Sequence, residues 1–569
     1  MSLQAAQAAI TQAQTLTANG KIGEARRTLI NALNATQSAD ARAQVTVALA
    51  AFHRSQGNFL DAAIAYGETS KIAGPMPELI LSEARCWTSG AKPLKAIERL
   101  KDMPDEAMGS YDYLSILADA QRRANHWEDA VPTARAALKV KPSSRNMKII
   151  LASALGRLNQ WEEADQLFDE LGPDSPLCIE MKSAALIECG RTEEAASLLR
   201  LAVADQPTHA RLHKGLAMLL WMQGDKTNFA ETLLQAADDH PEDMDLTLSA
   251  ADMLRRADRH VDALARLEAA STRLPSPAME SAVAILLAPA GRAEEGAELA
   301  EKSVQGAPET DWIRRNAACA LLAAGQFEAA ARHTAWGLQR DPTDQEWISL
   351  DVVARRGLGD ETYRYLYDYD RFVQPFDLDP PEGYDTIESF LEALATRLRE
   401  LHVFKNHPLD QSLRGGSQLV LNPDVPQDPL IELFFKALDK PIRGYMAHIG
   451  NDPSHPYTAR NTGEYDLQGA WSVRLTQGGS HVNHIHSEGW ISSAFYVSVP
   501  DDVTPDAATD DGWITFGEPR FPVPGISYEK KVCPKVGRLV LFPSYMWHGV
   551  RPFHQGEERM TIAFDIIPA

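Results

Sequence analysis

The chain has 569 residues, of which 44% are hydrophobic and 24% charged, a composition typical of a globular protein rather than a disordered or fibrous one. Its 78 acidic residues outnumber its 56 basic residues, and the formal net charge of −22 argues against binding to nucleic acid or to an anionic membrane. The five cysteines are scattered without a CxxC pair, which argues against a disulfide framework and favours a reducing compartment. The N-terminus lacks the pattern of a signal peptide and no apolar stretch reaches about 18 residues, so we expect a cytoplasmic protein without a membrane span.

Small residues recur through roughly the first 345 residues, mostly at steps of 33 to 35 positions. They are Ala25, Ala62, Ala96, Ala130, Ala164, Ala195, Ala230, Ala263, Gly296 and Ala329. A second series, Pro142, Pro176, Pro207, Pro241, Pro275, Pro308 and Pro342, has nearly the same period. The shared period predicts stacked helix–turn–helix units, in which the small residue lies where two helices cross and the proline ends the second helix.

This pattern resembles tetratricopeptide repeats. The resemblance implies an all-α superhelix over residues 1–350, with a concave groove that binds a protein or peptide. Alternatively, the repeats only support the chain or mediate self-association. The oligomeric state is not predicted.

The repeat pattern ends near Gly357, and we expect residues 351–470 to form a linker and a helical lead-in. Apolar residues at helical spacing predict a helix over Thr386–Leu401. A second helical stretch, about Pro429–Ile449, should be interrupted at Pro441, since proline removes a backbone donor and clashes with the preceding turn.

Short segments rich in β-branched and aromatic residues, separated by Gly or Pro, follow from residue 471 to residue 569. The candidate strands are Ala470–Leu475, Trp490–Val499, Gly512–Phe516, Arg538–Phe542 and Met560–Ile566. Repeated short strands of this kind predict a small barrel or jelly roll.

Three histidines in this region are candidate metal ligands. His484 and His486 would share one face of a strand, because side chains alternate along a strand, and His548 follows a later hydrophobic strand. Three ligands on one face leave coordination positions open for other molecules. Arg559 and Thr561 also share a strand face, and a guanidinium binds a carboxylate through two parallel hydrogen bonds.

The C-terminal motifs are His-x-His, then Gly-Trp-Ile-Ser-Ser-Ala-Phe-Tyr-Val, then Gly-Arg-Leu-Val-Leu-Phe-Pro-Ser-Tyr-Met-Trp-His, and finally Arg559. They resemble the iron(II)/2-oxoglutarate-dependent dioxygenases, in particular a bacterial branch in which this domain follows tetratricopeptide repeats. The resemblance implies a double-stranded β-helix (jelly roll) with flanking helices, and Fe(II) and 2-oxoglutarate as cofactors. It implies that His484 and His548 bind iron and that Arg559, assisted by Thr561, holds the distal carboxylate of 2-oxoglutarate. Tyr496 is a further candidate for contact with the cofactor.

Two points stay open. Most members of the superfamily have His-x-Asp or His-x-Glu, so the third ligand is either His486 or, in the other register, Glu488. The predicted function is oxygenation, namely hydroxylation of a protein or peptide recruited by the repeats. The alternatives are a repeat scaffold with a degenerate, inactive barrel and a three-histidine cupin-like metalloenzyme that does not use 2-oxoglutarate.

Overall fold

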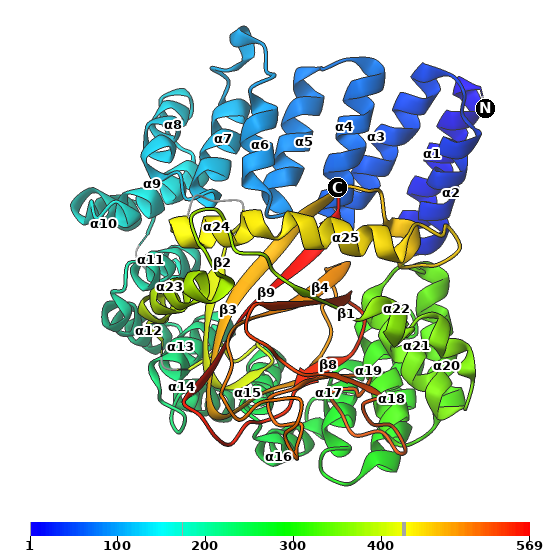
Figure 1. Cartoon of the computed structure of the whole chain (residues 1–569). Helices are drawn as coiled ribbons and strands as arrows, with labels where there is room; N and C mark the ends of the chain where they lie inside the picture. Colours follow the sequence, from blue (N-terminus) through cyan, green and yellow to red (C-terminus); the bar gives the residue numbers. More distant parts are fainter. Residues whose placement is uncertain (1, 173–174, 405, 424–427) are drawn as a thin grey trace. The chain divides into compact units, whose positions relative to one another are not determined.

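The computed structural model describes residues 2–172, 175–404, 406–423 and 428–569 (Figure 1). The chain forms two compact units, Met1–Asp205 and Gln206–Ala569. The boundary lies inside the repeat array, so the second unit contains the later repeats together with the C-terminal sheet. Among the described residues, no helix has both the length and the apolar character needed to cross a bilayer.

The first unit consists of antiparallel helix pairs. Its helices are α1 (Leu3–Ala18), α2 (Ile22–Ala35), α3 (Ala39–Ser55), α4 (Phe59–Ala73), α5 (Pro77–Ser89), α6 (Pro93–Leu100), η1 (Asp105–Ala107), α7 (Tyr111–Arg123), α8 (Trp127–Val140), α9 (Arg145–Arg157), α10 (Trp161–Glu170), α11 (Pro176–Glu188) and α12 (Thr192–Asp205). The turn within successive pairs contains one residue with positive φ, at Gly57, Ala91, Asn125, Asn159 and Gly190. Glycine and asparagine suit this left-handed backbone best, which explains the turn signals in the sequence.

The recurring small residues lie in the helix-packing contacts, as predicted. Ala130 and Ala164, for example, are fully buried in α8 and α10. The prediction was wrong at the last position, because Ala329 is partly exposed and its neighbour Ala330 is fully buried. Ala330 follows Phe327, the first residue of its helix, by three positions, as Ala130 follows Trp127. The helix start, rather than the spacing alone, therefore sets which residue faces the crossing.

The second unit continues the repeats with α13 (Ala210–Gln223), α14 (Glu231–Asp239), α15 (Met244–Arg256), α16 (His260–Ser271), α17 (Pro277–Leu287), α18 (Ala293–Gly306), α19 (Asp311–Ala323), α20 (Phe327–Arg340) and α21 (Gln345–Gly357). The elements that follow are η2 (Glu361–Tyr365), α22 (Tyr369–Phe372), α23 (Ile387–Leu401), α24 (Pro429–Ala437), α25 (Asp439–Ile449) and η3 (Thr458–Arg460). The helix predicted over Thr386–Leu401 is confirmed, with Thr386 as its N-cap. The expected interruption before Ile449 falls at Leu438, between α24 and α25, because Pro441 cannot accommodate the carbonyl four residues earlier.

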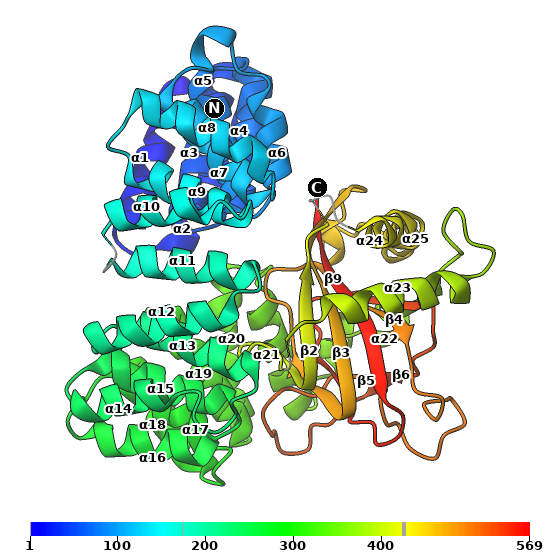
Figure 2. The ribbon, with the colours of Figure 1, turned by 90° about the vertical axis from the view of Figure 1, so that its left-hand side faces the viewer.

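A curled antiparallel sheet forms the C-terminal part of this unit (Figure 2). The described strands are β1 (Gln374–Asp377), β2 (Leu413–Leu421), β3 (Tyr465–His484), β4 (Ile491–Ser498), β5 (Ile514–Phe516), β6 (Lys530–Val532), β7 (Arg538–Pro543), β8 (His548–Val550) and β9 (Glu558–Pro568). Their order is β1-β7-β4-β9-β3-β8-β5-β6, and β2 pairs with β3. The long strand β3 pairs with β9 in its first part and with β8 at its end, so it carries the sheet around the curl of a jelly roll.

The sheet begins earlier in the chain than the expected boundary at residue 471. The segment 351–470, expected to be a linker and helical lead-in, contributes β1, which pairs with β7, and β2, which pairs with β3. The five predicted strands correspond to β3, β4, β5, β7 and β9. Residues 351–470 are thus an integral part of the jelly roll as well as its helical cover.

One continuous core joins the last repeats to the sheet. It includes Trp347 of α21, Phe390 of α23, Phe434 of α24 and Phe495 of β4. The rings of Phe434 and Phe495 lie 4.9 Å apart, which packs α24 against the sheet. The last repeats and the jelly roll of this unit therefore share one tightly packed core.

Candidate metal and cofactor site

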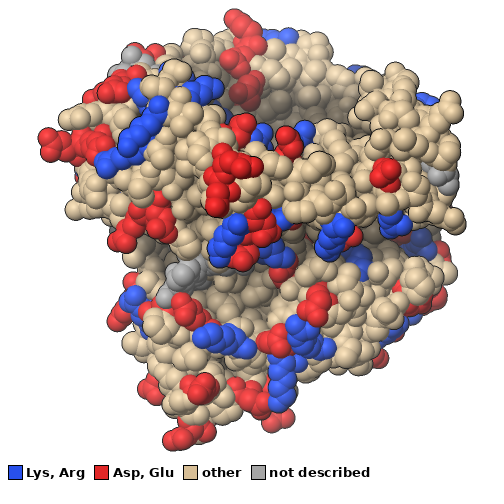
Figure 3. All heavy atoms as spheres, turned by 90° about the horizontal axis from the view of Figure 1, so that it is seen from above, with Lys and Arg blue, Asp and Glu red and all other residues tan. Residues whose placement is uncertain are grey.

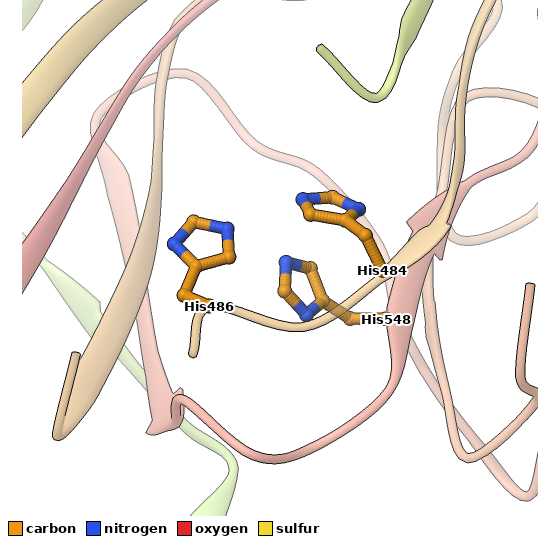
Figure 4. A group of neighbouring side chains, drawn as sticks. All are labelled: His484, His486 and His548. Carbon is orange, nitrogen blue, oxygen red and sulfur yellow. The ribbon is translucent and has the colours of Figure 1, made fainter. Parts of the chain in front are cut away.

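Three histidines converge at the place where β3 and β8 pair (Figure 4). His484 is the last residue of β3 and lies opposite His548, the first residue of β8. His486 lies just beyond the end of β3, in the segment that leads to β4. One ring nitrogen from each histidine lies within 4.8 Å of those of the other two, so these residues form a group that could hold a metal ion.

Hydrogen bonds fix the tautomer of two of these rings. His484 Nδ1 lies 2.9 Å from the Val482 carbonyl oxygen, and His548 Nδ1 lies 2.9 Å from the Met546 carbonyl oxygen. A carbonyl oxygen only accepts, so each Nδ1 carries the proton and donates it. Each Nε2 is therefore unprotonated and carries the lone pair with which a neutral imidazole binds a metal ion, and the Ser412 hydroxyl lies 3.3 Å from the Nε2 of His484.

His486 is held by a carboxylate instead of a carbonyl. Its Nδ1 donates to Asp565, whose two carboxylate oxygens lie 2.6 and 2.7 Å away. The Ser492 hydroxyl donates to Asp565 Oδ1 at 2.7 Å, and Ser544 Oγ lies 2.9 Å from Ser492 Oγ. This buried chain of hydroxyls and a carboxylate orients the ring of His486 toward the other two histidines.

The protonation of the three rings differs because their surroundings differ. Burial, followed by the neighbouring His486, lowers the pKa of His484 to about 3. Burial and the other two histidines also lower the pKa of His548. Burial disfavours a charged His486 as well, yet the Asp565 carboxylate raises the pKa of His486 above its usual value. The first two rings are therefore neutral near pH 7, as a metal ligand requires.

Arg559 is a buried cation without a counter-ion among the described residues. It is 1% exposed, and its Nε has no hydrogen-bond partner within that part of the chain. Its guanidinium lies 5.0 Å from the ring centre of Tyr496, whose hydroxyl is also buried without a partner. Burial lowers the pKa of Arg559. A buried charge without a counter-ion is costly, and the neighbouring Tyr496 hydroxyl offsets only part of that cost for Arg559, so the guanidinium indicates a place for an anionic ligand.

The histidines and Arg559 line one cavity of about 420 Å³. Every second residue from Arg559 to Asp565 lines it, namely Arg559, Thr561, Ala563 and Asp565 on one face of β9. Trp471 and Val473 of β3 lie opposite Ala563 and Thr561 and complete this wall. Three imidazole nitrogens and a buried guanidinium in one cavity form a donor set that fits a divalent iron ion and a dicarboxylate.

The predicted site residues therefore lie together. Thr561 is buried in the cavity wall, and Tyr496 faces Arg559 from β4. Glu488, the alternative third ligand, is an exposed residue of the cavity wall and is not in the group of metal donors. His481 is not in that group either, and its Nδ1 lies 3.0 Å from Ser412 Oγ.

Sequence reasoning missed Asp565, Ser492 and Ser412. Ser412 Oγ lies 3.3 Å from His484 Nε2, on a turn that precedes β2. The alternation that joined Arg559 to Thr561 also extends to Asp565, so this residue was detectable from the sequence. No comparable signal marks Ser492 or Ser412, whose places depend on strand pairing.

Comparisons with known proteins agree with this architecture. Residues 469–565 match a family model described as "Putative 2OG-Fe(II) oxygenase", and residues 117–176 and 184–243 match a tetratricopeptide repeat model. A comparison with curated proteins found no match.

Solved structures give only weak likenesses. Yeast Tom70 is 11% identical, with 70% of this chain and 97% of that chain covered and a TM-score of 0.32. The Cut9–Hcn1 hetero-tetramer of the APC/C is 10% identical, with 64% and 81% covered and a TM-score of 0.28. A Pseudomonas putida prolyl-4-hydroxylase is 16% identical, with 36% and 97% covered and a TM-score of 0.25. Scores this low carry no argument about function. The family models and the observed fold together show that the chain carries tetratricopeptide repeats followed by a C-terminal domain of the "Putative 2OG-Fe(II) oxygenase" family.

Proposed function

We propose that the protein is an Fe(II)- and 2-oxoglutarate-dependent oxygenase that hydroxylates a protein or peptide substrate recruited by its repeats. The observation that carries the proposal is the pairing, in one cavity, of three converging histidine nitrogens with the buried, unpaired Arg559. The match of residues 469–565 to the oxygenase family supports the same cofactors.

Each residue has a separate role in this proposal. His484, His486 and His548 hold the iron ion, and Arg559 binds the distal carboxylate of 2-oxoglutarate through its guanidinium. Thr561, which adjoins Arg559 on the same face of β9, can donate a hydroxyl hydrogen bond to that carboxylate. When bound, iron and 2-oxoglutarate supply O2 activation coupled to decarboxylation of the 2-oxo acid to succinate and CO2.

We propose His486 rather than Glu488 as the third ligand. The Nδ1 of His486 is engaged by Asp565, so its Nε2 is free and faces the other two rings. Asp565 also places a negative charge directly behind the ring, where it partly offsets the missing ligand carboxylate. Glu488 lacks comparable support, since it is exposed and lies outside the donor group.

A protein or peptide substrate accounts for the long repeat array, because a small metabolite would not need it. Tetratricopeptide repeats form extended surfaces that suit binding of a polypeptide. The rival hypotheses, an inactive scaffold or a three-histidine enzyme that does not use 2-oxoglutarate, leave the buried charge of Arg559 unexplained.

The test is succinate formation from 2-oxoglutarate by the iron-loaded full chain, with His548→Ala and Arg559→Ala as the informative variants. Two matched controls are His554→Ala and Arg551→Ala, since these residues are exposed and neither lines the cavity. The proposal predicts turnover in the wild type and both controls, with loss in both informative variants. Turnover that survives Arg559→Ala would favour the enzyme that does not use 2-oxoglutarate, and iron binding without succinate in the wild type would favour the scaffold.

A further inference from the structure

Arg520 is a second arginine in the wall of the metal cavity, and the proposed cofactor binding does not use it. It lies in the loop between β5 and β6, its side chain is exposed, and it forms no ion pair with the described residues. Its charge is close enough to the site to contribute to the low pKa of His484. A solvent-accessible guanidinium beside the iron site is well placed to meet a substrate.

Three more arginines lie close enough to Arg520 to act on its charge, and one of them, Arg414, lines the same cavity. We call these four residues the arginine cluster: Arg255, Arg256, Arg414 and Arg520. Arg255 and Arg256 end the repeat helix α15, while Arg414 belongs to β2. The side chain of Arg520 reaches solvent, yet protein atoms around the guanidinium partly desolvate it, and this desolvation and the like charges of the other three residues lower the pKa of Arg520. The cluster therefore lies where the repeats of the second unit meet the jelly roll.

The cluster carries more positive charge than its ion pairs neutralise. Arg255 and Arg256 share Asp252, each with a nitrogen 2.7 Å from a carboxylate oxygen. Arg414 pairs with Asp258 at 2.5 Å. Four guanidinium groups thus face two carboxylates, a surplus of two positive charges in a chain whose formal net charge is −22.

Contacts between the repeats and the jelly roll hold the arginine cluster in place. Asn406 Nδ2 donates to the Trp221 carbonyl oxygen of α13 at 2.8 Å. Arg356 of α21 donates to the carbonyl oxygens of Gly517 and Ser527, on either side of Arg520 in the sequence. The loop that carries Arg520 is therefore anchored to the same repeats that supply Arg255 and Arg256.

We propose that the arginine cluster binds an acidic segment of the polypeptide substrate, with Arg520 paired to a carboxylate next to the residue that is oxidised. This inference rests on the proposed function. Two exposed acids, Asp410 and Glu488, also line the cavity, so among its exposed residues the positive surplus belongs to the cluster, while the buried Arg559 is reserved for the cofactor in the proposed function. The cluster would therefore favour a substrate that has a carboxylate on the side of the cavity where the repeats meet the sheet.

A peptide fits this surface better than a nucleic acid does. Nucleic-acid binding relies on many phosphate contacts along an extended basic surface. Here the surplus is two charges. Figure 3 draws one face of the whole chain, on which acidic and basic side chains are interspersed. One or two carboxylates match the cluster, whereas a polyanion would be repelled by the net charge of the chain.

The test measures binding without catalysis. Fluorescein-labelled peptides of equal length, one rich in Glu, one in Gln and one in Lys, are titrated by fluorescence anisotropy against the full chain without iron or 2-oxoglutarate. The wild type should bind the Glu-rich peptide best, and the charge reversal Arg520→Glu should weaken that binding by about tenfold or more. The same variant should gain affinity for the Lys-rich peptide, a change that a purely structural role of Arg520 would not produce.

Arg273→Glu is the matched control, since Arg273 is exposed just past the end of α16 and its guanidinium donates to the Ala269 carbonyl of that helix. It should leave the affinity for the Glu-rich peptide unchanged. The inference is overturned if the Glu-rich peptide does not bind, if Arg520→Glu binds it as the wild type does, or if an RNA oligomer of the same length binds more tightly. A protein that forms succinate normally but shows one of these results would refute the inference alone and leave the proposed oxygenase intact.

Discussion

Replacing Asp565 by Asn removes the charge behind His486 with little change in shape. The Asn oxygen can still accept from His486 Nδ1, and its amide can donate to the Ser492 hydroxyl, so the ring should keep its orientation. What disappears is a carboxylate that is 6% exposed and has both oxygens within 2.7 Å of the ring nitrogen. The perturbation therefore tests the electrostatic role of Asp565 separately from its structural role.

The expected loss follows from the closeness of this contact. Removing a carboxylate that supports a histidine ligand typically reduces metal affinity by about 10- to 100-fold. This factor corresponds to about 1.4 to 2.7 kcal/mol of binding free energy. We expect the upper part of the range, because His486 stands where most members of the superfamily have a charged ligand.

The assay is anaerobic competition for Fe(II) between the protein and a chromophoric chelator. Asp501→Asn is the matched control, because Asp501 is exposed and lies outside the cavity. If a normally folded Asp565→Asn protein bound Fe(II) with wild-type affinity, the Asp565 carboxylate would not compensate for the missing ligand charge.

Three further predictions concern stability. A divalent metal at about 100 times its Kd should raise the free energy of unfolding by about 2.7 kcal/mol, and His548→Ala should abolish this gain in a thermal melt. Burial lowers the pKa of His407 to about 4, so the unfolded chain binds the proton first and stability should fall as pH drops from about 6.5 to 4. His407→Phe should flatten that slope by about 3 kcal/mol across this range in denaturant titrations, and an unchanged slope would contradict the assignment. Gly337→Ala should lower the free energy of unfolding by about 1 to 3 kcal/mol, because the new Cβ would lie 2.2 Å from Trp347. Gly444→Ala in α25 should instead raise it by up to about 1 kcal/mol, since alanine favours a helix more than glycine does. Melting temperatures equal to that of the wild type would contradict both predictions.

The repeats could be predicted from the sequence because close helix crossings demand a small residue at a fixed place. Ala130 and Ala164 show this requirement directly, since both are fully buried. The error at Ala329 arose where two alanines stand side by side and composition alone does not set the register. Local packing rules thus predict the repeat, and the start of each helix determines the final position.

The strands that were missed have weak local signals. Strand β1 has four residues and includes Pro375, and β2 contains Gly415 and Gly416 at a bulge opposite β3. Proline and glycine are unfavourable in strands, so these segments look like turns until their partners are known. Their pairing with β7 and β3 is a tertiary effect that the local sequence does not contain.

The candidate site also contains residues that the local sequence reveals and residues that only the tertiary structure brings together. His484 and His548 stood out because their residue type and order resemble a known motif, and His486 stood out because it occupies the place where that motif has an acid. Asp565 could have been found from the alternation of side chains along β9. Arg520 could not, because its proposed role depends on Arg255 and Arg256, which lie far away in the sequence. Residues proposed to hold the metal are therefore easier to find in the sequence than residues proposed to face the substrate.

We propose above all that one cavity binds iron through three histidines and 2-oxoglutarate through Arg559. The most direct measurement is an anaerobic titration of the full chain with Fe(II) and then 2-oxoglutarate, in which the visible metal-to-ligand charge-transfer band is followed. The account predicts a band that appears when 2-oxoglutarate is added and is lost in His548→Ala and in Arg559→Ala. Bound iron without such a band, or a band that survives Arg559→Ala, would contradict it.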